Sequence, residues 1–305
     1  MIISASRRTD IPAFHAEWFF RRLRQGFVLM HNHQNDERYY RVPLTPDVVD
    51  CIVFRTKNPA PMLSRLDELG DYNYLFNITM NPYWREMESS LPRLVERVET
   101  YKKLAEKVGP LRMIWRYDPV MLSPKYDLDF HRRAFEYLCR ELAPHSYKCM
   151  IGFIINHRFI AGRMAPMAIN QRSEVDMREI GEVFGGIAAR YGQKLETCAT
   201  EVSLDEFGIT HGACVEREQI EKIVGSRFEK VRERYLRPHC NCMESIDIGH
   251  YSTCGNGCQY CYATIETPRL DIPVDSPSLD PYFDASAPIV DIKCRSFRPA
   301  QASLW

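Results

Sequence analysis

The chain has 305 residues, of which 45% are hydrophobic and 26% are charged, and its formal net charge is zero. This size and composition predict a globular protein with a large core, and the neutral balance argues against a broad nucleic-acid-binding surface. No apolar stretch approaches the ~20 residues of a membrane-spanning helix, and the first residues lack the basic-then-apolar order of a signal peptide. We therefore expect a cytoplasmic protein with no membrane partner.

Strand-like and helix-like segments alternate along the first two hundred residues. The expected strands are rich in β-branched and aromatic residues. They occupy Ile2–Ser6, Cys51–Thr56, Tyr72–Met80, Leu111–Tyr117, Tyr147–Ile155 and Lys194–Cys198. The expected helices occupy His15–Arg24, Pro61–Leu69, Leu91–Val108, Asp129–Leu142, Asp176–Tyr191 and Glu216–Phe228. Residues 26–45 interrupt the alternation and predict an inserted β-hairpin, Phe27–Asn32 paired with Arg38–Leu44.

This alternation is typical of parallel βαβ units. It predicts an α/β fold built as a TIM-type (β/α) barrel, complete or partial, with an open doubly wound sheet as the alternative. No Gly-x-Gly-x-x-Gly follows the first strand, which disfavours a dinucleotide-binding sheet. We expect the barrel over residues 1–236, with the hairpin at 26–45, a cysteine-rich segment over 237–266 and an extended tail over 267–305.

Polar residues gather where the predicted strands end, which is where α/β barrels carry their function. They are Arg7, Arg55, Lys57, Asn77, Arg116 and Asp118. Taken singly, each is also explained by capping or by salt bridges that close a barrel. Taken together they predict a polar, partly cationic cavity for an anionic small-molecule substrate, since arginine suits carboxylate and phosphate groups.

Five of the 11 cysteines fall within residues 240–261. Disulfides are rare in the cytoplasm, so clustered cysteines indicate a metal centre. Residues 253–263 read TCGNGCQYCYA, which spaces Cys254, Cys258 and Cys261 as Cys-x-x-x-Cys-x-x-Cys. These three loop cysteines predict a [4Fe–4S] cluster with one iron left open, whereas a zinc knuckle would normally have two Cys-x-x-Cys pairs.

Four further cysteines predict a second centre: Cys198, Cys214, Cys240 and Cys242. This four-cysteine group would fully ligate a second [4Fe–4S] cluster, which would relay electrons, support the structure or bind substrate. A zinc ion is the chemical alternative. Ordinary buried cysteine is a further alternative, weakest for Cys240 and Cys242 because they lie one residue apart beside the loop cysteines.

The loop motif resembles that of the radical S-adenosylmethionine (SAM) enzymes. The resemblance implies that SAM binds the open iron, that Tyr260 flanks its adenine, and that one electron cleaves SAM to methionine and a 5′-deoxyadenosyl radical. It also implies a reducing donor such as ferredoxin or flavodoxin, and it makes the polar residues at the strand ends candidate cofactor contacts. Those enzymes carry the motif near the front of the barrel, whereas here it follows residue 250.

Residues 244–251 (ESIDIGHY) predict a strand that leads directly into the cysteine loop. We therefore expect a circularly permuted barrel, in which this late strand neighbours the first one and the loop still lies over the C-terminal mouth. Such an arrangement would place Arg7, Arg55, Asn77 and Arg116 in one cavity with the loop cysteines.

Most of the chain, to about Ala263, also resembles a bacterial family classed only as a domain of unknown function, whose C-terminal cysteines are noted as similar to the radical SAM cluster. The resemblance rests on residues 4–12 (SASRRTDIP), 56–59 (TKNP), 115–119 (WRYDP) and the cysteine block. Together these features predict a radical SAM-type enzyme.

Two alternatives remain open. One is a non-catalytic iron–sulfur protein for electron transfer or redox sensing. The other is a zinc-stabilised barrel that binds nucleic acid, because residues 260–263 (YCYA) resemble a segment of spore photoproduct lyase, a radical SAM enzyme of DNA repair. The zero net charge argues against a nucleic-acid partner.

Overall fold

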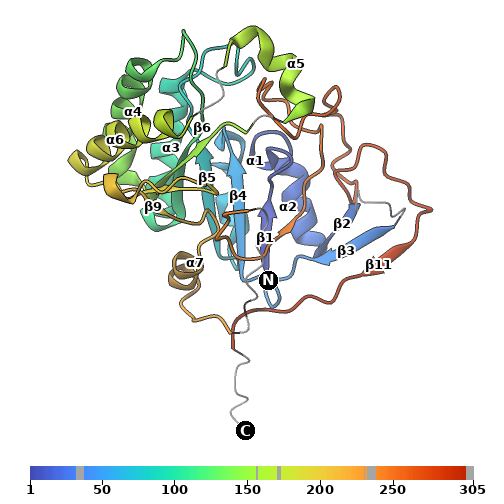
Figure 1. Ribbon diagram of the computed structural model, residues 1–305. Coiled ribbons are helices and arrows are strands. Elements are labelled where there is room, and N and C mark those ends of the chain that lie inside the picture. The colour runs from blue at the N-terminus through green and yellow to red at the C-terminus, as the bar shows by residue number, and fades with distance from the viewer. Residues whose placement is uncertain (32–37, 156, 170–172, 230, 232–237, 300–305) are drawn as a thin grey trace.

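The computed structural model describes residues 1–31, 38–155, 157–169, 173–229, 231 and 238–299. Its main feature is an eight-stranded sheet in the order β10-β1-β4-β5-β6-β7-β8-β9, in which every neighbouring pair is parallel (Figure 1). The strands are β1 (Ile2–Ala5), β4 (Cys51–Thr56), β5 (Tyr74–Thr79), β6 (Met113–Val120), β7 (Lys148–Phe153), β8 (Leu195–Thr197), β9 (Thr210–His211) and β10 (Ile246–Asp247). The predicted α/β class is confirmed.

The α-helices connect and flank these strands. They are α1 (Ile11–Phe14), α2 (Ala16–Gln25), α3 (Leu94–Val108), α4 (Leu128–Leu142), α5 (Ala161–Met164), α6 (Glu174–Arg190) and α7 (Arg217–Val224). The short 3₁₀ helices are Ala60–Met62, Leu66–Leu69, Pro110–Arg112, Ala143–His145, Arg158–Ile160, Ala165–Met167 and Asp205–Phe207. Helices α3, α4 and α6 lie together on one side of the sheet (Figure 1). On this side Phe135 of α4 stacks on Trp115 of β6, with ring centroids 5.4 Å apart.

The two faces of the sheet differ in chemistry, because successive side chains of a strand point to opposite sides. On β4, Ile52 and Phe54 belong to the main core beside the long helices. Val53 belongs to a second core on the other face, to which Ile220 of α7 also contributes. We name this second side the cysteine face, because it carries Cys198, Cys214, Cys240 and Cys242.

The sheet is open in the part of the chain that the structure describes. Strands β10 and β9 form its two edges, and each has only two residues. A TIM-type barrel requires a closed sheet, so the closed form of the prediction is not confirmed. What the structure supports is a large parallel sheet.

The late strand lies where the permutation hypothesis placed it. Strand β10 pairs in parallel with β1, in the register Ile3↔Ile246 and Ser4↔Asp247. Of residues 244–251, only two form the strand, although Ile248 still donates its backbone N–H to the Ser4 carbonyl. The first and last strands of this sheet along the chain are therefore neighbours in space.

The predicted helix Pro61–Leu69 is wrong. Two short 3₁₀ helices replace it, and Arg65 between them leaves the helical conformation, with φ −123°. The Arg65 guanidinium lies over the ring of Phe20 at 4.4 Å and pairs with Glu17, both of which belong to α2. These tertiary contacts outweigh the helix propensity of the segment.

The predicted hairpin is present as β2 (Phe27–His31) and β3 (Tyr39–Pro43), while Asn32 and the connection lie outside the described residues. The tail is not only an extended segment, because β11 (Ile289–Asp291) pairs in parallel with β3 and completes a three-stranded sheet. The red tail runs along this small sheet and then below the parallel sheet (Figure 1). The expected boundary at 236/237 and the end of the tail at 300–305 lie outside the described residues.

No helix within the described ranges has the length and apolar character needed to cross a membrane.

Candidate functional site

The end of β10 is tied to the end of β1 through one buried carboxylate. Asp247 accepts hydrogen bonds from the Ser6 hydroxyl at 2.7 Å and from the backbone N–H of Arg7 at 2.7 Å. Arg7 Nε lies 3.1 Å from the same carboxylate. These bonds hold the chain after β10 above the C-terminal ends of the parallel strands, where α/β proteins usually carry their sites.

The cysteine loop, residues 253–263, begins on contacts from the segment that follows β1. The Thr253 carbonyl accepts hydrogen bonds from Thr9 Oγ1 at 2.9 Å and from His15 Nε2 at 2.7 Å. Asn256 Nδ2 donates to Asp10 Oδ2 at 2.9 Å. Because these partners directly follow β1, the loop lies at the mouth of the sheet, as the sequence predicted.

Backbone conformation and close packing both require glycine at position 257, in the first gap of the motif. Its φ is +68°, which disfavours any residue with a side chain. A Cβ atom there would also lie 2.1 Å from Ser89 Oγ. The loop can therefore approach the segment around Ser89 only because this position is glycine.

The loop cysteines lie near enough to one another for their thiols to interact electrostatically. Cys258 is buried, whereas Cys254 and Cys261 are half-buried. Burial raises the pKa of the Cys254 thiol to about 12 and also raises the pKa of Cys258 well above its ordinary value, and neighbouring loop thiols add to both shifts. The Lys57 ammonium partly offsets the rise in the pKa of Cys258. No thiol–thiol hydrogen bond joins these three fully described residues.

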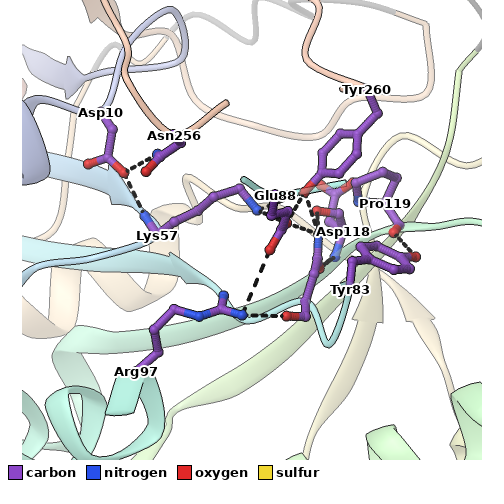
Figure 2. Close-up of polar contacts among 10 residues, drawn as sticks. Asp10, Lys57, Tyr83, Glu88, Arg97, Asp118, Pro119, Asn256 and Tyr260 are labelled. Atoms are coloured by element: carbon purple, nitrogen blue, oxygen red, sulfur yellow. Dashed lines mark hydrogen bonds and ion pairs between the residues drawn. The ribbon is translucent and has the colours of Figure 1, made fainter. Parts of the chain in front are cut away.

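A buried polar network holds the far side of the loop (Figure 2). Glu88 Oε1 accepts hydrogen bonds from Lys57 Nζ at 2.7 Å and from the Tyr260 hydroxyl. Asn81 Nδ2 donates to the Tyr260 hydroxyl at 2.9 Å, and Lys57 Nζ donates to it at 2.8 Å. The ring of Tyr260 is thereby fixed beside the last loop cysteine, Cys261.

Charge balance in this network depends on Glu88. Burial alone would lower the pKa of Lys57, but Glu88 and Cys258 together raise it. Burial, Glu88 and Cys258 all raise the pKa of Tyr260. Arg97 adds a second cation, 3.8 Å from Glu88 Oε2. The lysine therefore stays charged and the tyrosine stays protonated at neutral pH.

Sequence reasoning missed Glu88, Arg97 and Asp247, none of which belongs to a recognisable motif. Glu88 lies in a loop between β5 and α3, and its backbone forms an antiparallel bridge with Cys258. Only this pairing across the fold identifies it. The sequence indicates Asn81 only weakly, because this residue continues the alternation of polar side chains beyond the end of β5.

The structure brings the four-cysteine group together on the cysteine face. Cys214 Sγ lies 3.3 Å from Cys242 Sγ and 4.0 Å from Cys198 Sγ. Cys242 also interacts with the thiol of Cys240. All four side chains are buried, although they come from the end of β8, the loop after β9 and the segment before β10.

Two arginines and an asparagine surround this group. Arg55 donates to Cys214 Sγ at 3.1 Å, and Asn77 Nδ2 donates to the Cys214 carbonyl at 3.0 Å. Arg116 lies close enough to Cys214 and Cys198 for these thiols, with Asp118, to raise the pKa of its guanidinium despite burial. In Cys214, hydrogen bonds from Cys198 and Cys242, aided by both arginines, lower the pKa of the thiol.

Three buried polar atoms beside the four-cysteine group have no hydrogen-bond partner within the described residues. They are Arg55 Nε, Asn77 Oδ1 and Arg116 Nη1. Buried polar atoms are almost always paired in native proteins. The two arginine N–H groups therefore indicate a hydrogen-bond acceptor at this place, such as metal-bound sulfur, whereas Asn77 Oδ1 indicates a donor such as water.

The expectation of a single cavity is corrected. Arg55, Asn77 and Arg116 contact the four-cysteine group or lie beside it, although Arg55 is also close enough to Tyr262 of the loop to affect the pKa of its hydroxyl. The residues near the loop are Lys57 and Asp118, which follow Arg55 and Arg116 on the same strands. Alternation along a strand indicates which face a side chain takes, but not how deep along the sheet it lies.

Asp118 contacts residues next to both the four-cysteine group and the cysteine loop. It pairs with Arg116 through its carboxylate, and its backbone N–H donates to Asn81 Oδ1 at 3.0 Å. Gly152 on the neighbouring strand allows this, since a Cβ atom there would lie 2.6 Å from Asp118 Oδ1.

Arg7 lies at the β10 edge of the sheet, and its backbone carbonyl accepts a hydrogen bond from the Tyr262 hydroxyl of the cysteine loop at 2.7 Å. With Arg8, His31 and Asp247 it lines a cavity of about 340 Å³ between this edge and the hairpin. A second cavity of about 690 Å³ lies between the hairpin and the tail. The expected cationic cavity for an anion therefore lies beside the loop, not beneath it.

As placed, no three or more His, Cys, Asp or Glu side chains among the described residues converge closely enough to hold a metal ion. Sulfurs of the four-cysteine group hydrogen-bond one another, whereas no such bond joins the loop thiols among the described residues. Metal binding at either place requires the cysteine side chains to turn toward a common centre, which rotation about Cα–Cβ bonds permits.

Comparison with known proteins identifies one family. The family model described as Domain of unknown function (DUF1848) matches residues 2–263. No curated protein and no solved structure matches the chain. The matched range begins at β1 and ends with the cysteine loop, so it contains the parallel sheet and all seven candidate metal-ligating cysteines, but not β11.

Proposed function

We propose that this chain, which belongs to the DUF1848 family, is an iron–sulfur enzyme of the radical SAM type. One observation carries the proposal: a three-cysteine loop directly follows a strand and lies over the C-terminal ends of a large parallel sheet. In this proposal the open sheet is a partial, circularly permuted barrel, with β10 as the strand that precedes the loop.

The loop cysteines fit a [4Fe–4S] cluster with one open iron. Each of the other eight cysteines in the chain lies elsewhere: four in the four-cysteine group, and the rest at Cys51, Cys139, Cys149 and Cys294. Three thiolates can then come from the protein, and the fourth iron would take SAM. When bound, such a cluster supplies the electron that cleaves SAM.

The surrounding residues would hold this site rather than react. Lys57 stabilises negative charge on Cys258, because a nearby cation favours the thiolate. Tyr260 would offer its ring, fixed by Glu88 and Asn81, as a wall for the adenine of SAM. Arg163 donates to the Cys261 carbonyl at 2.7 Å and keeps the end of the loop in place.

The substrate would be a small anionic molecule. Arg7 and Arg8 line the cavity of about 340 Å³ beside the loop, and guanidinium groups favour carboxylate or phosphate. A reducing donor such as ferredoxin or flavodoxin would deliver the electron. The neutral net charge continues to argue against nucleic acid as the substrate.

Anaerobic reconstitution of the full chain tests the proposal. We expect about four iron atoms per chain at the loop, with methionine released from SAM under a strong reductant. Cys258→Ser should lose both the iron and SAM cleavage. Cys294→Ser, which changes a cysteine of the tail, should keep both and serves as the matched control.

Three other results would contradict the proposal. Iron without SAM binding would favour an electron-transfer or redox-sensing protein. Salt-dependent DNA binding by a chain that holds zinc and no iron would favour the nucleic-acid alternative. Undiminished SAM cleavage in Cys258→Ser would remove the loop from the chemistry.

A further inference from the structure

Sulfur atoms of the four-cysteine group lie close to one another. In the four-cysteine group, two sulfur pairs are 3.3 and 4.0 Å apart. Tetrahedral zinc–thiolate bonds of about 2.3 Å place their sulfurs roughly 3.8 Å apart. In an iron–sulfur cubane each thiolate binds a different iron, so its cysteine sulfurs lie farther apart. These two separations are nearer to the sulfur spacing of a single-ion site than to that of a cubane, and rotation of the cysteine side chains would bring the four sulfurs to a common centre.

We infer that Cys198, Cys214, Cys240 and Cys242 bind a single zinc ion, and that this ion fastens β10 and the cysteine loop to the sheet. This replaces the second [4Fe–4S] cluster expected from the sequence. It does not depend on the radical SAM proposal, which concerns other cysteines.

Charge supports the assignment. Four thiolates around Zn²⁺ carry a net charge of −2 after four thiol protons have left, and such a charge needs compensation when it is buried. Arg55 already donates to Cys214 Sγ, and Arg116 lies beside Cys214 and Cys198. The unpaired Arg55 Nε and Arg116 Nη1 remain available to zinc-bound sulfur. Hydrogen bonds of this kind around the ligands are typical of zinc sites.

The connectivity explains what the ion would do. It joins Cys198 after β8, Cys214 after β9, and Cys240 with Cys242 shortly before β10. Strand β10 is an edge strand of only two residues, so its own ladder holds it weakly. A backbone bond from the Met243 N–H to the Val215 carbonyl, 3.0 Å long, already links two of these segments. A zinc ion bound by four thiolates would hold these segments together and fix the position of the cysteine loop above the sheet.

The test is metal analysis of the full chain, isolated anaerobically without chelators. We expect about one zinc ion per chain and a zinc absorption-edge spectrum with four sulfur neighbours at about 2.3 Å. Cys242→Ser should lower zinc affinity at least tenfold. Cys149→Ser is the matched control, because Cys149 is equally buried but belongs to the core beside the long helices. It should keep the ion.

A second variant distinguishes the loss of a zinc ligand from simple misfolding. Cys242→His should retain zinc, since imidazole is a good zinc ligand. Cys258→Ser should keep zinc while losing loop iron, so failure here is distinguishable from failure of the radical SAM proposal. About eight iron atoms per chain, no metal at all, or full zinc retention in a Cys214→Ser/Cys242→Ser double variant would each overturn the inference.

Discussion

At the scale of single residues, the cysteine loop depends on groups that no motif identifies. Glu88 has a buried carboxylate that accepts hydrogen bonds from Lys57 and Tyr260, and its backbone pairs with Cys258. A buried carboxylate is stable only when such partners compensate its lost hydration. The position of the loop and the charge of Lys57 are therefore coupled through one side chain.

Glu88→Gln should test this coupling. The amide keeps the shape but leaves the Lys57 ammonium without its anionic partner, so we expect a loss of about 2–3 kcal/mol in the free energy of unfolding. Denaturant titration measures this loss. Thiol labelling of Cys258 in the folded protein should become faster, because the loop is released.

Glu86→Gln is the matched control on the same segment. Glu86 is half-exposed and pairs with Lys125, and surface pairs of this kind contribute little. Its loss should stay below about 0.5 kcal/mol. Equal losses in the two variants would contradict the role assigned to Glu88.

At the scale of elements, β6 and α4 are joined through a fully buried histidine. His131 of α4 accepts a hydrogen bond from the Tyr117 hydroxyl at Nδ1, 2.7 Å away, and donates from Nε2 to the Met121 carbonyl at 2.8 Å. The neutral imidazole satisfies both ring nitrogens in this arrangement. Burial lowers the pKa of His131 to about 4.

This lowered pKa predicts acid sensitivity. Between pH 6.5 and 4 the unfolded chain binds more protons at this histidine than the folded one, so its contribution to stability is present above pH 6.5. The contribution is lost as pH falls through 4 and amounts to roughly 3 kcal/mol at most. His131→Gln should remove this part of the pH dependence, measured as the free energy of unfolding at several pH values.

His145→Gln serves as the comparison, since His145 is only half-buried on a surface turn. That variant should keep the pH dependence of the original chain. A His131→Gln protein whose stability still falls as steeply with acid would contradict the assignment.

Elements with a strong local signal were predictable, and those that depend on distant contacts were not. Six strands were located by their β-branched and aromatic residues, because buried parallel strands are hydrophobic on both faces. The helix expected at Pro61–Leu69 failed because Arg65 packs on Phe20. Strand β11 was missed because Ile289–Asp291 becomes a strand only beside β3.

At the scale of the whole molecule, the tail ties the N-terminal ends of the parallel strands together. Asp50, directly before β4, is fully buried and accepts a hydrogen bond from the Phe297 backbone N–H at 2.7 Å. Arg298 Nε donates to the same carboxylate at 2.9 Å. Phe297 belongs to the core of the cysteine face, so the tail closes that core from below.

Asp50→Asn should therefore destabilise the whole fold. The amide removes the charge that Arg298 and the buried N–H groups require, and we expect a loss of about 3 kcal/mol in the free energy of unfolding. Thermal denaturation together with limited proteolysis of the tail measures it. Asp47→Asn, three residues away and exposed, should have almost no effect; if it costs as much, the buried carboxylate is not the cause.

The sequence by itself determined the α/β class, most strands and helices, and both sets of cysteines, because periodicity and spacing are local properties. Only the tertiary structure decided that the sheet is open over the described residues, that Arg55 and Arg116 lie at the four-cysteine group, and that Arg7 lies at the β10 edge. It also brought the sulfurs of Cys198, Cys214 and Cys242 close together. Such features depend on depth, register and distance between remote segments, which a linear pattern does not contain.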